Sequence, residues 1–161
     1  MVVEMDRKDW ESFGDVELFM SCMEPTVLQV RGKDPAVKSQ VISQLNSGQQ
    51  ALFMFRLLYP ATNSAVDYYS WISYLLEQPN YWVGIIDGLR FFGDTSMIRL
   101  LEETAGILKA RTNEISSEDK IELQAKITPL FEKFQNTVPD YLQQISSYIR
   151  SNPEEFVQFK N

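Results

Sequence analysis

Four charged side chains, Arg56, Asp67, Asp87 and Arg90, lie within or next to the least charged stretch of the sequence. The 48 residues from 39 to 86 contain only three charged side chains, so most of this stretch is expected to be buried. A buried charge needs an oppositely charged or hydrogen-bonding partner. Asp87 and Arg90 are spaced so that they can pair on one helix face. Two interpretations stay open: salt bridges that fix the register of helices, or a polar pocket that binds a small ligand.

Acidic side chains form the second pattern with a chemical meaning. The chain has 15 basic and 22 acidic residues, which gives it a formal net charge of −7. Carboxylates spaced along helices can imitate DNA phosphates and attract a basic partner by electrostatic steering. The predicted partner-binding face consists of Glu102, Glu103, Glu118, Asp119 and Glu122. The ordinary alternative is a solvated helix surface, because Lys109, Lys120 and Lys126 interleave with these acids.

Catalytic groups are scarce in this sequence. Without histidine, the chain can form neither a Ser-His-Asp or Cys-His site nor a histidine-bearing zinc site. Cys22 is the single cysteine, and a lone thiol cannot build a zinc or iron–sulfur centre. Glu102 and Glu103 are adjacent, so on a helix they point about 100° apart and cannot act as a glycosidase pair. We therefore predict no catalytic residues, no metal and no cofactor, and a non-enzymatic protein that acts by binding another protein.

Two further patterns have both a functional and an ordinary interpretation. The loop at 31–33 (Arg-Gly-Lys) precedes a helix N-terminus, where phosphate can bind, but without the repeated glycines of a P-loop it is typical of a solvated loop. The stretch 68–92 holds 8 of the 20 aromatic residues. Nucleobase stacking needs a basic groove, and Arg90 is the only base in this block, so a packed core is favoured. A subset, Tyr68, Tyr74 and Tyr81, is also suited to contact a second copy of the chain.

Helix signals recur along the chain, and these elements must position the residues above. Helix starts are predicted at Asp34 with Pro35, at Ser47 with Gln50, at Ser64 with Asp67, and at Asp94. Strand-like alternation appears only weakly, at 26–30. The predicted fold is a single all-α domain over residues 1–161, a bundle of seven or eight helices with 39–86 as its apolar centre.

Prolines divide the C-terminal region in this interpretation. Pro129 should kink the helix that contains it, because proline removes a backbone hydrogen bond. Pro139 is expected to begin a separate helix. Pro153 then starts a short turn that places Phe156 and Phe159 back on the body of the domain.

Composition also indicates where the protein acts. A single cysteine is typical of a reducing compartment. Residues 1–6 contain acids where a secretory signal needs an apolar run, and no uncharged stretch has the length and apolarity of a membrane span. We therefore expect a cytoplasmic protein that contacts no membrane. Its net negative charge also argues against direct binding to nucleic acid, which requires positive charge.

Several short motifs occur in the order found in a known family. They are LNSGQQAL at 45–52, GLRFFGD at 88–94, LLEE at 100–103, and the segment 142–156, which ends in RSNPEEF. Over roughly residues 40–158 the chain resembles the bacterial DNA-mimic-protein-like family of all-helical domains. Residues 62–69 lack the glycines of that family's loop before an aromatic helix. The resemblance implies an all-α fold and an acidic protein that binds a basic DNA-binding protein in place of DNA, and it supplies no catalytic residues.

Overall fold

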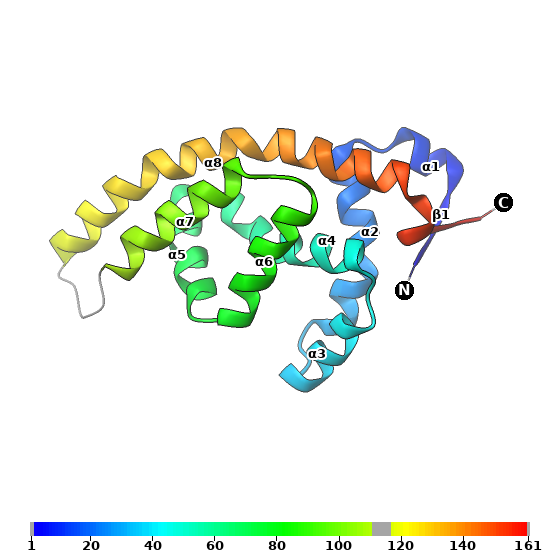
Figure 1. Ribbon diagram of the computed structural model, residues 1–161, viewed down its shortest axis with the longest axis horizontal. Helices are drawn as coiled ribbons and strands as arrows, with labels where there is room; N and C mark the ends of the chain where they lie inside the picture. Colours follow the sequence, from blue (N-terminus) through cyan, green and yellow to red (C-terminus); the bar gives the residue numbers. More distant parts are fainter. Residues whose placement is uncertain (1, 111–116, 161) are drawn as a thin grey trace.

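One long helix, α8 (Ser117–Ser151), arches over the other helices in the computed structural model, which describes residues 2–110 and 117–160 (Figure 1). The other helices are α1 (Arg7–Ser12), α2 (Asp15–Val30), α3 (Pro35–Ser43), α4 (Ser47–Leu58), α5 (Ala65–Leu76), α6 (Pro79–Phe91) and α7 (Ser96–Lys109). The shorter elements are the strands β1 (Val3–Asp6) and β2 (Val157–Lys160) and the 3-10 turns η1 (Tyr59–Thr62) and η2 (Pro153–Glu155). The predicted class, a single all-α domain, is confirmed for the described residues.

Helix α8 runs without interruption through two prolines, where the sequence predicted two separate helices. Pro129 and Pro139 each remove one hydrogen bond of the helix, yet both residues are exposed. Water can therefore replace the lost bonds. The opposite side of α8 buries an apolar row over the same turns, formed by Leu130, Phe131, Phe134, Val138, Tyr141 and Leu142. Because this row packs on the helices below, α8 bends as a gradual curve and does not break at Pro139 (Figure 1).

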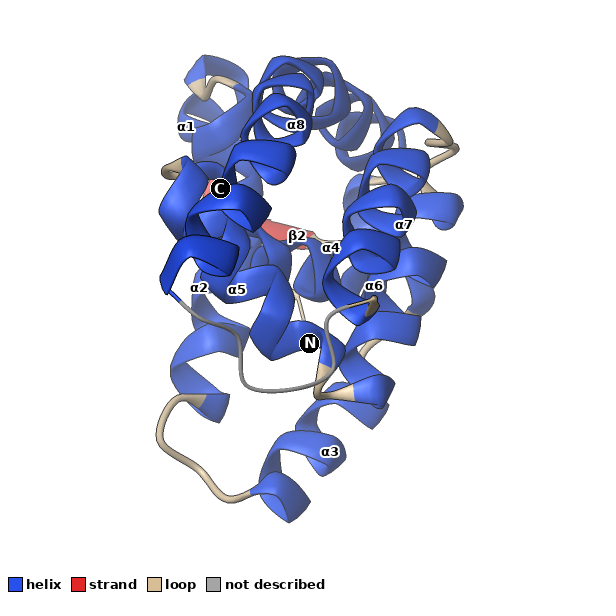
Figure 2. Cartoon of the chain, turned by 90° about the vertical axis from the view of Figure 1, so that its left-hand side faces the viewer, coloured by secondary structure: helices blue, strands red, loops and turns tan. Residues whose placement is uncertain are grey.

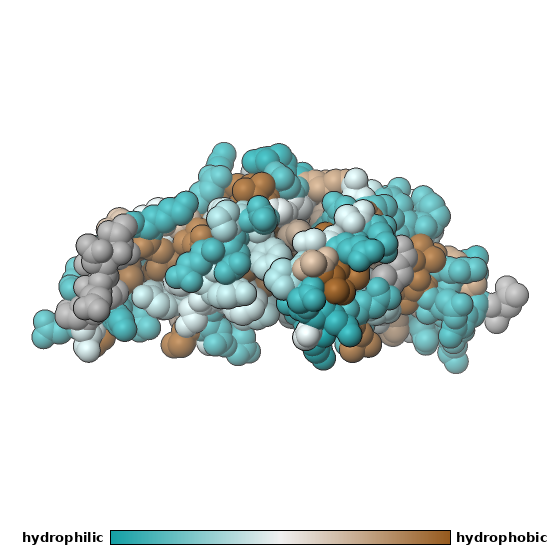
Figure 3. All heavy atoms as spheres, turned by 90° about the horizontal axis from the view of Figure 1, so that it is seen from below, coloured by the Kyte–Doolittle hydropathy of each residue, from teal (hydrophilic) through white to brown (hydrophobic). Residues whose placement is uncertain are grey.

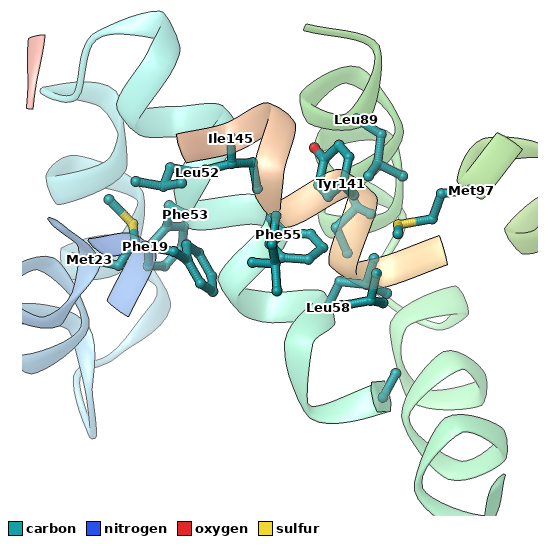
Figure 4. Close-up of a cluster of buried hydrophobic side chains, with 14 of the residues drawn as sticks. Phe19, Met23, Leu52, Phe53, Phe55, Leu58, Leu89, Met97, Tyr141 and Ile145 are labelled. Carbon is teal, nitrogen blue, oxygen red and sulfur yellow. The ribbon is translucent and has the colours of Figure 1, made fainter. Parts of the chain in front are cut away.

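The core lies between α4 and α8, with α2 on one side and α6 and α7 on the other (Figure 4). Phe55 of α4 is 2% exposed, and its ring centroid lies 4.7 Å from that of Tyr141 in α8 and 5.2 Å from that of Phe19 in α2. Within the expected centre at 39–86, α4 and α5 supply buried residues, but α3 supplies none. Helix α3 lies at the edge of the domain in two perpendicular views (Figures 1 and 2). The centre is therefore built from α4 and α5 together with helices that lie wholly or partly outside 39–86.

Side-chain caps fix the start of several helices. Asp34, Ser64 and Asp94 accept hydrogen bonds from the backbone N–H groups of Val37, Asp67 and Met97, at 3.0, 3.1 and 2.7 Å respectively. Asp34 and Ser64 are the predicted N-caps of α3 and α5, whereas Asp94 lies one residue before Thr95, the N-cap of α7. Each bond satisfies one of the N–H groups that a helix N-terminus leaves without an internal partner.

The cap of α4 lies one residue earlier than predicted. Asn46 and Gln49 form the capping box, in place of Ser47 and Gln50. The side-chain amide of Asn46 also donates to the carbonyl oxygen of Glu155 at 2.9 Å. This second bond joins α4 to the far end of the chain, so the choice between the two caps depends on a contact that no local pattern contains.

Two short strands join the first and last described segments of the chain. β1 and β2 pair in parallel, with Val3 opposite Val157. The turn η2 precedes β2 and brings Phe156 into the core, as predicted, while the Phe159 ring packs edge-on against Trp10 at 5.3 Å. The segment 26–30, where strand-like alternation is weak, forms the last turns of α2 and buries Thr26 and Val30, in agreement with the predicted all-α fold.

The surface shows no single apolar patch on the face seen in Figure 3. Exposed apolar side chains appear there as small separate areas among hydrophilic ones (Figure 3). Such scattered side chains are normal on a monomeric domain. In the part of the chain that the structure describes, no helix combines the length and apolarity needed to cross a bilayer.

Candidate functional site

The structure brings together two of the four charged residues of the predicted pocket. Arg56, in the last turn of α4, and Asp67, in the first turn of α5, line one open cavity of about 530 Å³. The chain turns through η1, with Pro60 in its first turn, so that the end of α4 and the start of α5 border the same space. We call this space the first cavity. Its lining consists of Met20, Arg56, Tyr59, Pro60, Thr62, Asn63, Asp67, Ser70 and Trp71.

The other two charged residues lie elsewhere. Asp87 and Arg90 form an ion pair on α6, with 3.3 Å between Oδ1 and Nη1, and their side chains are 66% and 65% exposed. Neither residue lines the first cavity. The four charges therefore do not form one pocket. The physical reason is the helix period, which places Asp87 and Arg90 on the solvent side of α6, where neither needs a buried partner.

Asp67 is oriented by its neighbours. Nδ2 of Asn63 donates to Oδ2 of Asp67, and Oγ of Ser64 accepts from the Asp67 backbone N–H. On the same rim, Oγ1 of Thr62 donates to the Tyr59 carbonyl at 2.7 Å. Oδ1 of Asp67 has no hydrogen-bond partner within residues 2–110 and 117–160. One carboxylate oxygen is thus held in place while the other stays available.

Arg56 is half-buried, and its Nε atom is fully buried. This atom has no hydrogen-bond partner among the residues that the structure describes. Leaving a buried donor unpaired costs about 1–3 kcal/mol, so a position of this kind calls for an explanation. The guanidinium is a rigid fork of N–H donors whose geometry matches carboxylate and phosphate groups.

A second cavity of about 360 Å³ also borders Arg56. It is lined by Val27, Val30, Arg31, Gly32, Lys38, Ile42, Phe53, Arg56, Leu57, Pro60, Trp71 and Tyr81. Arg56, Pro60 and Trp71 line both cavities, and we call the two together the Arg56 groove. The sequence predicts a solvated loop at 31–33 and gives Lys38 no distinguishing pattern. No local sequence pattern indicates that Arg31 and Lys38 lie near Arg56, because it is the packing of α3 against α2 that brings them there.

Trp71 forms a wall shared by the two cavities. Its indole N–H donates to the Leu57 carbonyl, and its ring centroid lies 5.1 Å from that of Tyr74. These contacts fix the plane of the ring, while part of the side chain stays exposed. The predicted packed core therefore applies to Tyr68, which is fully buried, whereas Trp71 presents a fixed aromatic surface to the groove.

The predicted acidic face lies on α7 and the first turns of α8, which pack against each other (Figure 1). Glu102, Glu103, Glu118 and Glu122 are exposed, while Asp119 is half-buried and interacts within the protein. The exposed lysines among them are Lys109, Lys120 and Lys126. The face is therefore negative with a mixture of positive charge.

Three buried groups titrate away from their ordinary range, and they belong to the core. Burial raises the pKa of Tyr68 to about 12, although its hydrogen bond to Thr104 opposes the shift. Burial also raises the pKa of the Cys22 thiol to about 12, opposed by the charge of Arg150. Burial and then the charge of Asp94 raise the pKa of Tyr141. None of the three lines the Arg56 groove.

Known proteins give no independent guide to this site. No family model, curated protein or solved structure matches the chain. The resemblance of residues 40–158 to the DNA-mimic family stays a prediction from motifs. Within the described ranges, no three Cys, Asp or Glu side chains are grouped so that they could hold a metal ion. The Arg56 groove and the acidic face are therefore the two candidate sites in the described residues.

Proposed function

We propose that this protein is a non-enzymatic domain that binds a small molecule in the first cavity of the Arg56 groove. The observation that carries the proposal is the guanidinium of Arg56, which lines a cavity together with Asp67 and has no hydrogen-bond or ion-pair partner among the described residues. The volume of about 530 Å³ is typical of small-molecule sites, which span roughly 300–1,000 Å³. A ligand in this cavity can accept hydrogen bonds from the terminal N–H groups of Arg56.

Arg56 and Asp67 divide the polar recognition between them. The guanidinium donates to an acceptor or an anionic group of the ligand, and the free Oδ1 of Asp67 accepts from a ligand N–H or O–H. The hydroxyl of Ser70 can do either. Trp71 and Met20 supply apolar surface for the body of the ligand. These groups together favour a small molecule that carries both an acceptor and a donor, such as a zwitterion.

The first cavity offers binding groups without an activated nucleophile. A lining hydroxyl needs a general base to become nucleophilic, and the sequence has no histidine. The Thr62 hydroxyl donates its hydrogen bond to the Tyr59 carbonyl. Asp67 accepts a hydrogen bond from the side chain of Asn63 and none from a lining hydroxyl of the described residues. Binding without bond-making is the function that these side chains support.

An NMR titration that follows the indole N–H signals tests the proposal. The chain has three tryptophans, and Trp71 lines the groove while Trp10 and Trp82 line neither of its cavities. Free polar amino acids serve as zwitterionic probes. We expect the Trp71 signal to shift while the other two indole signals stay in place. A probe at 100 times its dissociation constant should also add about 2.7 kcal/mol to the free energy of unfolding.

Matched variants decide whether the shift reports the first cavity. Arg56→Gln and Asp67→Asn should each weaken the shift of the Trp71 signal, because each removes one half of the polar recognition. Arg90→Gln is the control, since Arg90 lies on the solvent side of α6. The proposal is wrong if no zwitterion moves the Trp71 signal, or if the shift survives in both groove variants.

A second candidate function rests on the acidic face. Four of its five carboxylates are exposed on two helices that pack together, in a chain of net charge −7. A surface of this kind can occupy the DNA site of a basic DNA-binding protein and increase the rate of association by steering. The second candidate is therefore an acidic interaction protein that acts as a DNA mimic.

Capture of a basic DNA-binding protein by the purified chain tests this second function. Binding should weaken as salt rises, because charges are screened beyond about 10 Å at 0.1 M ionic strength, and DNA should compete. The test variant replaces Glu102, Glu103, Glu118, Asp119 and Glu122 by their amides. The control variant replaces five exposed acids elsewhere: Glu11, Glu17, Glu24, Asp140 and Glu154. The acidic face would be excluded as the binding surface if both variants lost capture equally. It would also be excluded if capture did not change with salt concentration or with added DNA.

A further inference from the structure

The second cavity of the Arg56 groove is lined by positive charge, although the protein as a whole is negatively charged. Arg31, Lys38 and Arg56 line it, and no Asp or Glu among the described residues does. The three cations come from the residue after α2, from α3 and from α4. None of them forms an ion pair with a residue that the structure describes. In a chain of net charge −7, this cavity therefore concentrates positive potential.

Apolar side chains form the remaining walls of the second cavity. They are Val27 and Val30 from α2, Ile42 from α3, Phe53 and Leu57 from α4, and the rings of Trp71 and Tyr81. Charges interact more strongly beside apolar walls than in open water. The flat faces of tryptophan and tyrosine pack well against a planar ligand. The cations of the cavity therefore favour an anionic group on the ligand, and the apolar walls favour a planar apolar body.

We propose that the second cavity binds an organic anion, with one carboxylate, sulfonate or phosphate group on a planar apolar body of one or two rings. The inference rests on the proposed function, because Arg56 belongs to both cavities, and it names the class of ligand. The anionic group lies among Arg31, Lys38 and Arg56 and accepts from the terminal N–H groups of the Arg56 guanidinium. The ring system packs on Trp71. A volume of about 360 Å³, near the lower end of ligand sites, sets the size of the body.

Two simpler occupants leave part of the cavity unused. An inorganic anion satisfies the three cations but leaves the apolar walls in contact with water, which gives up the hydrophobic contribution. A neutral aromatic molecule covers those walls but leaves the cations without an anion. An organic anion satisfies both sets of groups at once.

Three probes of similar shape and different charge test the class of ligand. They are 1-naphthoate, its neutral amide 1-naphthamide, and the cation 1-naphthylmethylammonium. Affinities are measured by calorimetry, and the Trp71 indole signal reports the place of binding. We expect 1-naphthoate to bind about tenfold tighter than the amide, because a charge-assisted hydrogen bond is worth that much or more. The cation should bind weakest of the three.

A pair of double variants separates the second cavity from the rest of the molecule. Arg31→Gln with Lys38→Gln should weaken 1-naphthoate by about tenfold and leave 1-naphthamide unchanged. The control is Arg99→Gln with Lys126→Gln, which removes the same charge from two exposed positions outside the groove. It should leave all three affinities unchanged, and circular dichroism checks that both variants keep their helical content. Asp67→Asn should not weaken 1-naphthoate.

The outcomes distinguish this inference from the proposed function. If the amide or the cation binds as tightly as 1-naphthoate, or if both double variants behave alike, the anion class is wrong. If 1-naphthoate leaves the Trp71 signal unchanged at about millimolar concentration, the second cavity is not an organic-anion site. In either case zwitterions that shift Trp71 through Arg56 and Asp67 still support the proposed function. If neither probe set shifts the Trp71 signal, both proposals fail.

Discussion

Tyr68 and Arg56 both place a polar group in apolar surroundings, with opposite outcomes. Tyr68 is 0% exposed, and its hydroxyl oxygen lies 2.8 Å from Oγ1 of Thr104. Oγ1 of Thr104 donates to the Leu100 carbonyl at 2.8 Å, so it accepts the Tyr68 proton, and both hydroxyls are satisfied. The buried Nε of Arg56 has no such partner in the described chain.

The difference separates a polar group that holds helices together from one that is available to a ligand. The hydrogen bond between Tyr68 and Thr104 joins α5 to α7. The ring of Phe134, in α8, packs against the Tyr68 ring with 5.0 Å between the ring centroids. A satisfied buried pair of this kind specifies one way of packing. Arg56 instead borders two cavities. We therefore expect the core to lose stability on small changes and the groove to lose binding without losing the fold.

The largest expected effect is the loss of stability in Phe55→Ala. The Phe55 ring packs against Phe19, Tyr59 and Tyr141 in the core. Removing a buried phenylalanine leaves a cavity and costs about 3–5 kcal/mol. Chemical denaturation measures the change in free energy of unfolding. Phe91→Ala is the control, because Phe91 is 40% exposed and its loss should cost far less. Equal costs for the two variants would contradict this account of the core.

Alkaline pH should produce the next largest effect. Burial raises the pKa of Cys22 from 9.0 to about 12 and that of Tyr68 from 10.0 to about 12. The folded state holds both protons more tightly than the unfolded state does. The stabilisation is therefore complete below about pH 9 and is lost as the pH rises from there to about 12. By about pH 11 the shift of Cys22 accounts for about two pKa units and that of Tyr68 for about one, so at about 1.4 kcal/mol per unit we expect a loss of about 4 kcal/mol.

Denaturation midpoints measured across this alkaline range check the expectation. Cys22→Ala removes the buried group with the lowest ordinary pKa, so the fall in stability should become shallower and begin at higher pH. A midpoint that stays constant from neutral pH to about pH 11 would show that neither proton is held by the fold.

Tyr68→Phe should have a smaller effect, because it deletes one hydrogen bond and keeps the ring. Thr104 keeps its acceptor, the Leu100 carbonyl, so no buried donor is left unpaired. The expected cost is about 1 kcal/mol. Tyr74→Phe serves as the control, since Tyr74 is exposed and should tolerate the change. If both variants unfold at the same denaturant concentration as the original chain, the bond between Tyr68 and Thr104 contributes nothing.

Arg56→Gln should have the smallest effect on stability, because it removes the unpaired Nε. The free energy of unfolding should stay within about 0.5 kcal/mol of the original value or rise slightly. Binding of zwitterions and of 1-naphthoate should weaken in the same variant. A stability loss as large as that of Phe55→Ala would mean that Arg56 holds the core, and the comparison between the two regions would no longer stand.

The fold could be predicted largely because its signals are local. The caps at Asp34 and Ser64 bond to groups a few residues away, so the sequence contains both partners. The continuity of α8 could not be predicted, because Pro129 and Pro139 are tolerated only where distant helices pack against the opposite side. The pairing of β1 with β2 joins two very short segments from opposite ends of the sequence, and such segments carry almost no pattern.

The candidate site could be predicted only in part, for a related reason. Arg56 and Asp67 stand out because charges are scarce around them in the sequence. Asp87 and Arg90 share that signal, but their solvent-facing positions on α6 become evident only once the helix is packed. Surface cations such as Lys38 are common in any sequence, and only the packing of α3 places this one beside Arg56.

The pairing of β1 with β2 also sets an order of events when the chain folds. Val3 pairs with Val157, so forming the sheet closes a loop that contains all of the helices. The entropic cost of closure grows with loop length, and contacts between neighbouring helices form faster. During synthesis β1 has no partner until β2 has left the ribosome. We therefore expect the contacts between neighbouring helices to form first, and the sheet to form late, together with the contacts of α1 and α2 with the end of α8.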